Sequence, residues 1–247
     1  MNADMETIAD DSSVRPQRRS AGRGLTRLLN YAIGKEILVL GPSGAGKTKF
    51  TDYLRLGALD PEGKREMTYH IRKSPSFIVG LGPNKHLALK VRRAVDTPGQ
   101  VGPWQHGKLV GRRRPHAVIV VLDSTTALST TVAWLRLFCS RLDTVLRDRS
   151  YVKRKLSEIV VLLNKRDQID NQAFHELRQG VKAVLEQHLS LVLGPERVQS
   201  IPVVECISIQ TDHGTKLIDY VISYLTHRLT EGPKLGARTP PTSTQYY

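Results

Sequence analysis

Long apolar runs are the first feature that this 247-residue sequence lacks. No stretch reaches the roughly 18 apolar residues that a membrane-spanning helix needs, and residues 1–20 show no apolar segment typical of a secretory signal. Residue 2 is Asn2 and the chain ends in Tyr247, so neither myristoylation nor prenylation is expected. Only Cys139 and Cys206 occur, which excludes a disulfide framework and favours a reducing compartment. We expect a cytoplasmic protein.

Acidic residues are also scarce. Asp and Glu number 23 against 37 Lys and Arg, which gives a net charge of +14. Such a charge attracts nucleic acid, acidic proteins or an anionic membrane surface at which the protein would be peripheral, but a plain basic surface explains it equally well. Two clusters stand out, Lys108–Arg114 and Arg147–Lys155. Few aromatics accompany them beyond Trp104, so base stacking is not indicated and two solvated faces are the favoured interpretation.

Between polar ends, strand and helix patterns alternate. We expect a basic tail with a short helix at 1–34, one domain at 35–230, and a disordered tail at 231–247. Strands are predicted at 37–40, 77–81, 87–95, 117–122, 159–163 and 203–207, and helices at 47–56, 128–147, 173–192 and 215–229. This alternation predicts a three-layer α/β fold, with a mostly parallel sheet and helices on both faces. Ligands of such folds bind at the carboxyl ends of the strands.

A glycine-rich loop lies at the first such end. It has the pattern G-x-x-x-x-G-K-[ST] between a strand and a helix, the context in which this pattern binds nucleoside triphosphates. Glycines let successive N–H groups point at phosphate oxygens, Lys47 can reach the β- and γ-phosphates and act in catalysis, and the Thr48 hydroxyl can ligate Mg²⁺. The predicted phosphate-binding residues are Gly41, Ser43, Gly44, Ala45, Gly46, Lys47, Thr48 and Lys49.

A second strand runs into Asp96-Thr97-Pro98-Gly99-Gln100. Asp96 is placed to hold Mg²⁺ through a water. The N–H of Gly99 can bond the γ-phosphate, and Gln100 is predicted to orient the attacking water. The turn would be unremarkable alone, but together with the phosphate loop it favours a nucleotide site.

A third strand ends in Asn164-Lys165-Arg166-Asp167. The Asp167 carboxylate can accept hydrogen bonds from N1–H and the 2-amino group of guanine, a donor pair that adenine lacks. The stem of Lys165 can lie along the base, whereas Asn164 is expected to tie this segment to the phosphate loop. GTP or GDP is therefore the expected ligand, and an ATPase is disfavoured. A fourth strand end carries Cys206-Ile207-Ser208, where a backbone N–H could bond guanine O6; a plain strand end explains it equally well.

The order of these motifs resembles that of the Ras-like small GTPases among the P-loop GTPases, over roughly residues 36–229. Val120–Ser124 and Glu205–Ser208 are similar to segments of the Arf branch, which includes bacterial relatives and the signal-recognition-particle receptor β subunit. The resemblance implies a six-stranded sheet, five helices and two switch segments that sense the γ-phosphate. It also implies a molecular switch that hydrolyses GTP slowly, recruits a protein effector in the GTP state and is stimulated by a GTPase-activating protein.

Several residues depart from the family pattern. Ser43 stands where Ras proteins have a glycine that admits an arginine finger, Pro98 precedes Gly99, and Ile207 replaces an alanine. The switch I ligand of Mg²⁺ is open between Thr68 and Ser74, the latter fitting the Arf spacing. A rival function is a constitutively nucleotide-loaded interaction module with negligible hydrolysis.

Overall fold

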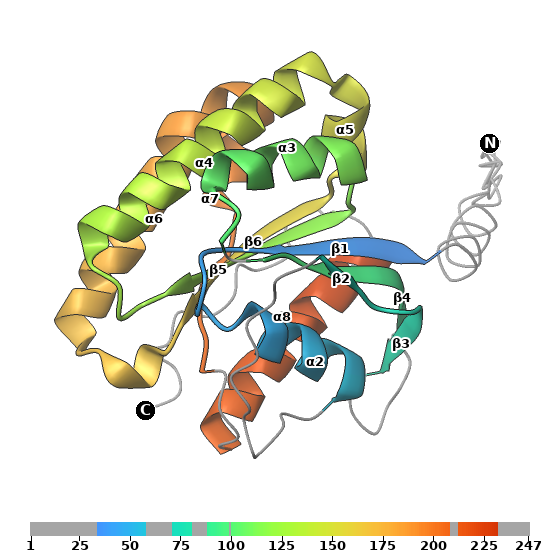
Figure 1. The fold of residues 1–247 in the computed structure, drawn as a ribbon, viewed down its shortest axis with the longest axis horizontal. Coiled ribbons are helices and arrows are strands. Elements are labelled where there is room, and N and C mark those ends of the chain that lie inside the picture. The colour runs from blue at the N-terminus through green and yellow to red at the C-terminus, as the bar shows by residue number, and fades with distance from the viewer. Residues whose placement is uncertain (1–33, 58–70, 81–87, 99, 208–211, 232–247) are drawn as a thin grey trace, which may run out of the picture.

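The computed structural model describes residues 34–57, 71–80, 88–98, 100–207 and 212–231. Strands and helices alternate along these residues as the sequence predicts, and they build one sheet with helices around it (Figure 1). The proposed tails lie almost wholly outside the described residues, so the boundaries of the domain stay predictions.

The strands are β1 (Lys35–Leu40), β2 (Arg72–Lys73), β3 (Phe77–Gly80), β4 (Ala88–Asp96), β5 (Ala117–Asp123), β6 (Glu158–Asn164) and β7 (Val203–Glu205). Every residue of β5 and β6 is buried. Because both faces of these central strands are covered by helices, their interiors are uniformly apolar. Polar side chains occur only at the ends, at Glu158, Asp123 and Asn164.

The sheet has the order β2-β4-β1-β5-β6-β7, and β3 also pairs with β4. Strands β4, β1, β5, β6 and β7 are parallel, whereas β2 and β3 run antiparallel to β4. Arg72 faces Asp96 and Phe77 faces Val91 in one continuous register, so β2 and β3 are two parts of a single edge strand. Of the seven strands in the described residues, six occupy the six predicted positions, and only β2 was not expected.

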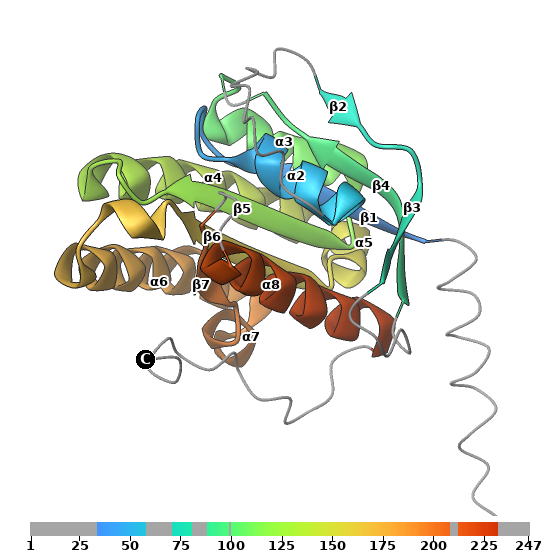
Figure 2. The same ribbon diagram turned by 90° about the horizontal axis from the view of Figure 1, so that it is seen from below.

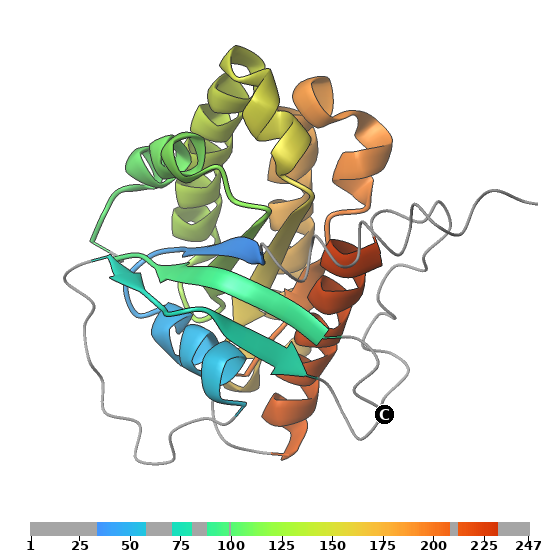
Figure 3. The ribbon, with the colours of Figure 1, turned by 90° about the vertical axis from the view of Figure 1, so that its right-hand side faces the viewer.

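The helices are α2 (Lys47–Leu56), α3 (Pro103–Arg113), α4 (Leu128–Asp148), α5 (Ser150–Lys155), α6 (Asn171–Leu193), α7 (Pro195–Gln199) and α8 (Asp212–Glu231), with a 3₁₀ turn at Arg166–Gln168. Helices α3, α4 and α6 cover one face of the sheet, and α2 and α8 cover the other (Figures 2 and 3). Each face has its own apolar core. Among the described residues, no helix is long and apolar enough to cross a membrane.

Two short helices correct the sequence prediction. The stretch from Arg147 to the strand at Glu158 was predicted to be a loop, but α5 forms within it because Val152 is fully buried in the core beneath α4. Pro195, beyond the helix predicted at 173–192, begins the additional helix α7. A proline suits a first helical position, where no N–H partner is needed. The strand predicted at 203–207 ends at Glu205. The described residues contain seven α-helices, the short helices α5 and α7 being additional to the five that the resemblance implies.

The parallel pairing brings the carboxyl ends of the strands to one edge, on the left in Figure 1. There Val39 pairs with Asp96, and Asp123 pairs with Asn164. The loops that carry the sequence motifs leave the sheet from this edge and therefore lie beside one another.

Candidate nucleotide-binding site

The glycine-rich loop connects β1 to α2 and turns tightly. Gly41, Gly44 and Gly46 have φ angles of 144°, 74° and 97°, which L side chains rarely adopt. A Cβ on Gly41 would lie 2.0 Å from the carbonyl oxygen of Val121, so the loop passes directly against β5. Gly46 caps α2, whose amino end carries the positive pole of the helix dipole. The loop therefore has the backbone shape that a phosphate cradle requires.

Lys47 lies across this loop. Its side chain is buried, and Nζ donates a hydrogen bond of 2.7 Å to the carbonyl oxygen of Pro42. Burial lowers the pKa of Lys47, while the nearby charge of Asp96 acts in the opposite direction. The ammonium group is thus held at the mouth of the loop, where a phosphate oxygen could compensate its charge.

Thr48 and Asp96 meet although they are 48 residues apart. The Thr48 hydroxyl donates a hydrogen bond of 2.7 Å to Oδ2 of Asp96, whose side chain is 2% exposed. A hydroxyl and a carboxylate side by side are the hard oxygen donors that Mg²⁺ prefers, with phosphates and waters completing the shell. Within the described ranges, no group of three or more His, Cys, Asp or Glu side chains could hold a metal ion. The donor set therefore fits a magnesium ion bound jointly with a nucleotide rather than a dedicated metal site.

Of the two candidates for the switch I ligand, Thr68 and Ser74, the structure describes only Ser74. Thr68 lies outside the described residues. The Ser74 hydroxyl accepts a 2.9 Å hydrogen bond from the N–H of Ala94, two residues before the end of β4. Ser74 is therefore held back from the edge that carries Asp96, because it lies beyond Arg72 along the antiparallel strand.

The segment after β4 leads into α3. Gly99 lies outside the described residues, and Gln100 beyond it is exposed. Thr97 is buried; its hydroxyl lies 3.1 Å from the carbonyl oxygen of Val39 and 3.3 Å from Nε2 of His106. This contact anchors the start of α3 to the sheet next to Asp96.

His106 is a buried residue that the sequence did not mark. Its ring is fully buried on α3 and lies 5.6 Å from the Trp134 ring of α4. Burial, and secondarily the charge of Lys47, lowers the pKa of His106 to about 4, so the ring is neutral near pH 7. A single histidine in a basic segment carries no local signal that it is a core residue.

The end of β6 confirms the contact predicted for Asn164. Its Nδ2 donates a buried hydrogen bond of 2.8 Å to the carbonyl oxygen of Ala45, inside the glycine-rich loop. Lys165 follows in a left-handed conformation with φ of 63°. Asp167 is exposed within the 3₁₀ turn, with its carboxylate accessible to a ligand.

Asp123 is a site residue that sequence reasoning missed. At the end of β5 it forms an ion pair with Lys165 and accepts hydrogen bonds from the N–H and hydroxyl of Thr125, at 3.0 and 2.7 Å. Burial acts to raise the pKa of Asp123, but these hydrogen bonds lower it below its ordinary value. Asp123 thereby fixes the ammonium group of Lys165. Its place at a strand end was a signal that could have been used.

The base loop after β7 lies beside this pair. The Cys206 N–H donates to the carbonyl oxygen of Leu163 at 2.9 Å, and the Cys206 carbonyl accepts from the Arg166 N–H at 3.3 Å. These bonds hold the loop against the end of β6, and the N–H of Cys206 is already paired. Ile207 is buried, and Ser208 lies outside the described residues.

No protein-family model matches the sequence, and no curated protein matches it. Among solved structures, the chain is similar to a bacterial selenocysteine-specific elongation factor, with a TM-score of 0.50 and 18% identity. The two proteins share an α/β fold over the matched region. The match covers 81% of this chain and 29% of the elongation factor, so the chain spans less than a third of that protein. At this identity the likeness shows the fold alone, and it does not support the Arf branch in particular.

Proposed function

We propose that this protein binds GTP with Mg²⁺ and hydrolyses it to GDP as a molecular switch that recruits a protein partner in the GTP state. One observation carries the proposal: two side-chain contacts join the three motifs. Thr48 contacts Asp96, and Asn164 contacts Ala45, so the glycine-rich loop, the end of β4 and the end of β6 form a single site.

The phosphates would lie in the glycine-rich loop. Lys47, now bonded to the carbonyl oxygen of Pro42, would turn its ammonium group to the β- and γ-phosphates. Thr48 and Asp96 would hold Mg²⁺, and Thr68 remains the proposed switch I ligand. The metal ion would supply positive charge that stabilises the transferring phosphoryl group. The burial of Lys47 strengthens its attraction to a phosphate, because water screens the charge less there.

Guanine would lie at the ends of β6 and β7. The exposed carboxylate of Asp167 would accept hydrogen bonds from the base, while the stem of Lys165 packs along its plane. The ion pair with Asp123 supports this arrangement, because it restricts the rotamers of Lys165 before the base arrives. The proposed contact from the 206–208 segment would come from the N–H groups that follow Cys206.

Nucleotide binding is tested with the full chain and a fluorescent GTP analogue in the presence of Mg²⁺. Lys47→Ala should abolish binding, whereas Lys182→Ala, which removes an exposed lysine from α6, should bind as the wild type does. GTP affinity that survives Lys47→Ala would exclude the proposed phosphate site.

Hydrolysis is tested by following phosphate release from GTP. The wild type should release phosphate slowly, and Gln100→Leu should release it more slowly still while binding GTP as tightly. A GTPase-activating partner would be expected to accelerate only the wild type. If the purified protein retained GTP and neither form released phosphate, the constitutively loaded interaction module would replace the switch.

A further inference from the structure

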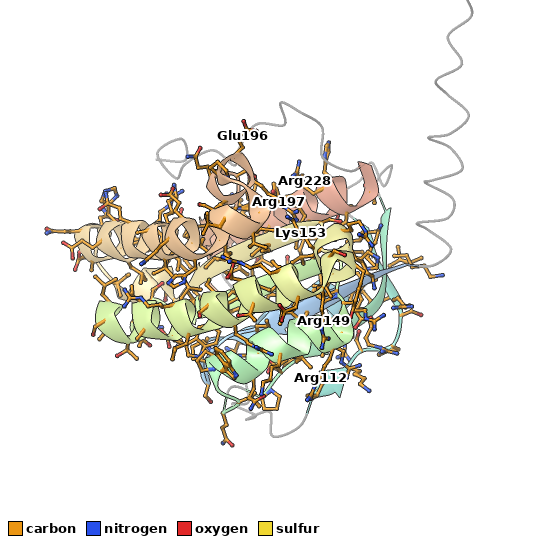
Figure 4. The ribbon with its side chains drawn as sticks, turned by 90° about the horizontal axis from the view of Figure 1, so that it is seen from above. Arg112, Arg149, Lys153, Glu196, Arg197 and Arg228 are labelled. Carbon is orange, nitrogen blue, oxygen red and sulfur yellow. The ribbon has the colours of Figure 1, made fainter. Side chains whose placement is uncertain are left out.

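The opposite edge of the sheet, where the parallel strands begin, carries a dense set of basic side chains. Together they form the basic end of the molecule, which faces the viewer in Figure 3. Its members come from β1, β4, the end of α3 and the region from the end of α4 through α5. All nine side chains are at least partly exposed. They are Lys35, Arg92, Arg112, Arg113, Arg114, Arg149, Lys153, Arg154 and Lys155. Figure 4 shows Arg112, Arg149 and Lys153 on neighbouring elements at this end.

Folding joins two clusters that are separate in the sequence. The Arg149 guanidinium donates a hydrogen bond of 3.1 Å to the carbonyl oxygen of Gly111, in the last turn of α3. The Arg114 guanidinium lies over the Tyr151 ring of α5, 4.5 Å from its centroid. Helix α3 also packs closely on α4, because a Cβ on Gly111 would lie 3.0 Å from a methyl group of Val145. The basic groups are therefore held on one rigid surface.

Few acidic side chains balance this surface. Glu36 lies beside it but is buried, and it pairs with Arg92 at 3.0 Å. Asp148 precedes Arg149 and is exposed, and Glu158 begins β6 at this end but is buried. The neighbouring Arg228 is not counted in the basic end, because its charge is balanced by the Glu158 carboxylate, 2.9 Å away.

Burial first, and like charges second, lower the pKa values of two lysines within the basic end. Burial lowers the pKa of Lys35, and the charge of Lys155 lowers it further. Burial likewise lowers the pKa of Lys155; Glu36 acts against this, and Arg92 adds to it. A surface that holds cations this close together is stabilised by a bound polyanion.

We propose that the basic end binds the phosphate backbone of a nucleic-acid duplex without reading its sequence. Six of the nine basic residues are arginines, whose planar guanidinium groups match phosphate oxygens in a bidentate manner. Among the exposed large hydrophobic side chains in the described part of the chain, Tyr151 lies on α5 within this end, and Arg114 stacks on it. Ile78 is also exposed, on the edge strand β3 opposite Lys90. These two separate side chains do not form the continuous apolar face that anchors a helix in a bilayer, and they provide no series of aromatics for unpaired bases.

The test uses the full chain and a fluorescently labelled DNA duplex of about 20 base pairs in arbitrary sequence, titrated between about 50 and 200 mM NaCl. The logarithm of affinity should fall linearly with the logarithm of salt concentration, by about 0.9 for each phosphate neutralised. The triple variant Arg112→Ser, Lys153→Ser and Arg154→Ser should bind more weakly and lose up to about three from that slope.

A charge-matched control removes three exposed basic residues from α4, α6 and α8: Arg136→Ser, Lys182→Ser and Lys216→Ser. It should keep the wild-type slope. Urea unfolding of both triple variants should match the wild type, which confirms that the comparison is made on folded protein. Equal losses in the two variants would attribute binding to net charge and overturn the proposal. An unchanged slope in the basic-end variant would also overturn it. Binding to phosphatidylserine vesicles is measured in parallel, and a basic-end variant that loses vesicle binding but keeps duplex binding would contradict the proposal as well.

Discussion

His116 should make the fold sensitive to acid. It lies between α3 and β5, and its Nδ1 accepts a hydrogen bond of 3.0 Å from the N–H of Glu36, so that nitrogen must be unprotonated in the folded state. Burial lowers the pKa of His116 from 6.5 to about 4, and the positive charges of Lys155, Lys35 and Arg92 contribute further. Protonation breaks the hydrogen bond and adds a cation to the basic end.

The sign of the effect follows from the two pKa values. Because the folded value lies below the unfolded one, the unfolded chain binds more protons between pH 4 and pH 6.5. The stabilisation is complete above pH 6.5 and is lost as the pH falls toward 4. Between pH 7.5 and pH 5.0 the loss is about 2 kcal/mol of unfolding free energy. This is an upper limit for a half-buried ring that water partly screens, and it equals about 4–8 °C in Tm.

The assay is urea unfolding at the two pH values. His116→Asn supplies an oxygen that can accept the same hydrogen bond but cannot titrate, so its loss of stability on acidification should be smaller than that of the wild type by up to about 2 kcal/mol. Some acid sensitivity remains in both proteins, since His106 also has a pKa of about 4. His175→Asn, at an exposed position of α6, should behave as the wild type. Equal losses in His116→Asn and the wild type would refute the reasoning.

Three further substitutions test the site. Gly41→Ala should destabilise the fold by more than about 2 kcal/mol in thermal unfolding, because its Cβ would meet the carbonyl oxygen of Val121 at 2.0 Å. Gly57→Ala is the control: it is also at positive φ but has open space around its Cβ, so it should destabilise the fold less. Asn164→Ala removes the bond to the glycine-rich loop and should cost about 1–3 kcal/mol in urea unfolding and weaken nucleotide binding; wild-type values for both would show that the contact is dispensable. Asp167→Asn should lower GTP affinity and favour a xanthine nucleotide, because the 2-oxo group of xanthine replaces the amino donor of guanine. A competition titration between the two nucleotides measures this preference. If the variant still prefers GTP, the guanine assignment is wrong.

Local sequence sufficed where one segment carries its own signal. The apolar runs of β5 and β6 predicted buried parallel strands, and every residue in both is buried because the two faces of the sheet each pack against a core. It failed for α5, whose three consecutive basic residues suggested a loop. That helix forms because Val152 enters the core, and such a tertiary contact cannot be read from the segment alone.

Within the site, spacing left the choice between Thr68 and Ser74 open. The antiparallel register of β2 on β4 places Ser74 opposite Ala94, away from the edge that holds Asp96. Asp123 was missed for a related reason, since its partner Lys165 is 42 residues away and follows the end of another strand.

Sequence patterns alone predicted that three motifs stand at the ends of strands, because their residue types and the apolar runs before them are local properties. The same patterns predicted that Asn164 would contact the glycine-rich loop, but which atoms meet depends on the tertiary structure. Thr48 bonds to Asp96, which is 48 residues away in the sequence, and Asn164 bonds to Ala45, which is 119 residues away. The two basic clusters likewise converge because Arg149 bonds to Gly111. Strand order and register produce these contacts, and both depend on long-range packing of the sheet against its helices rather than on any one segment.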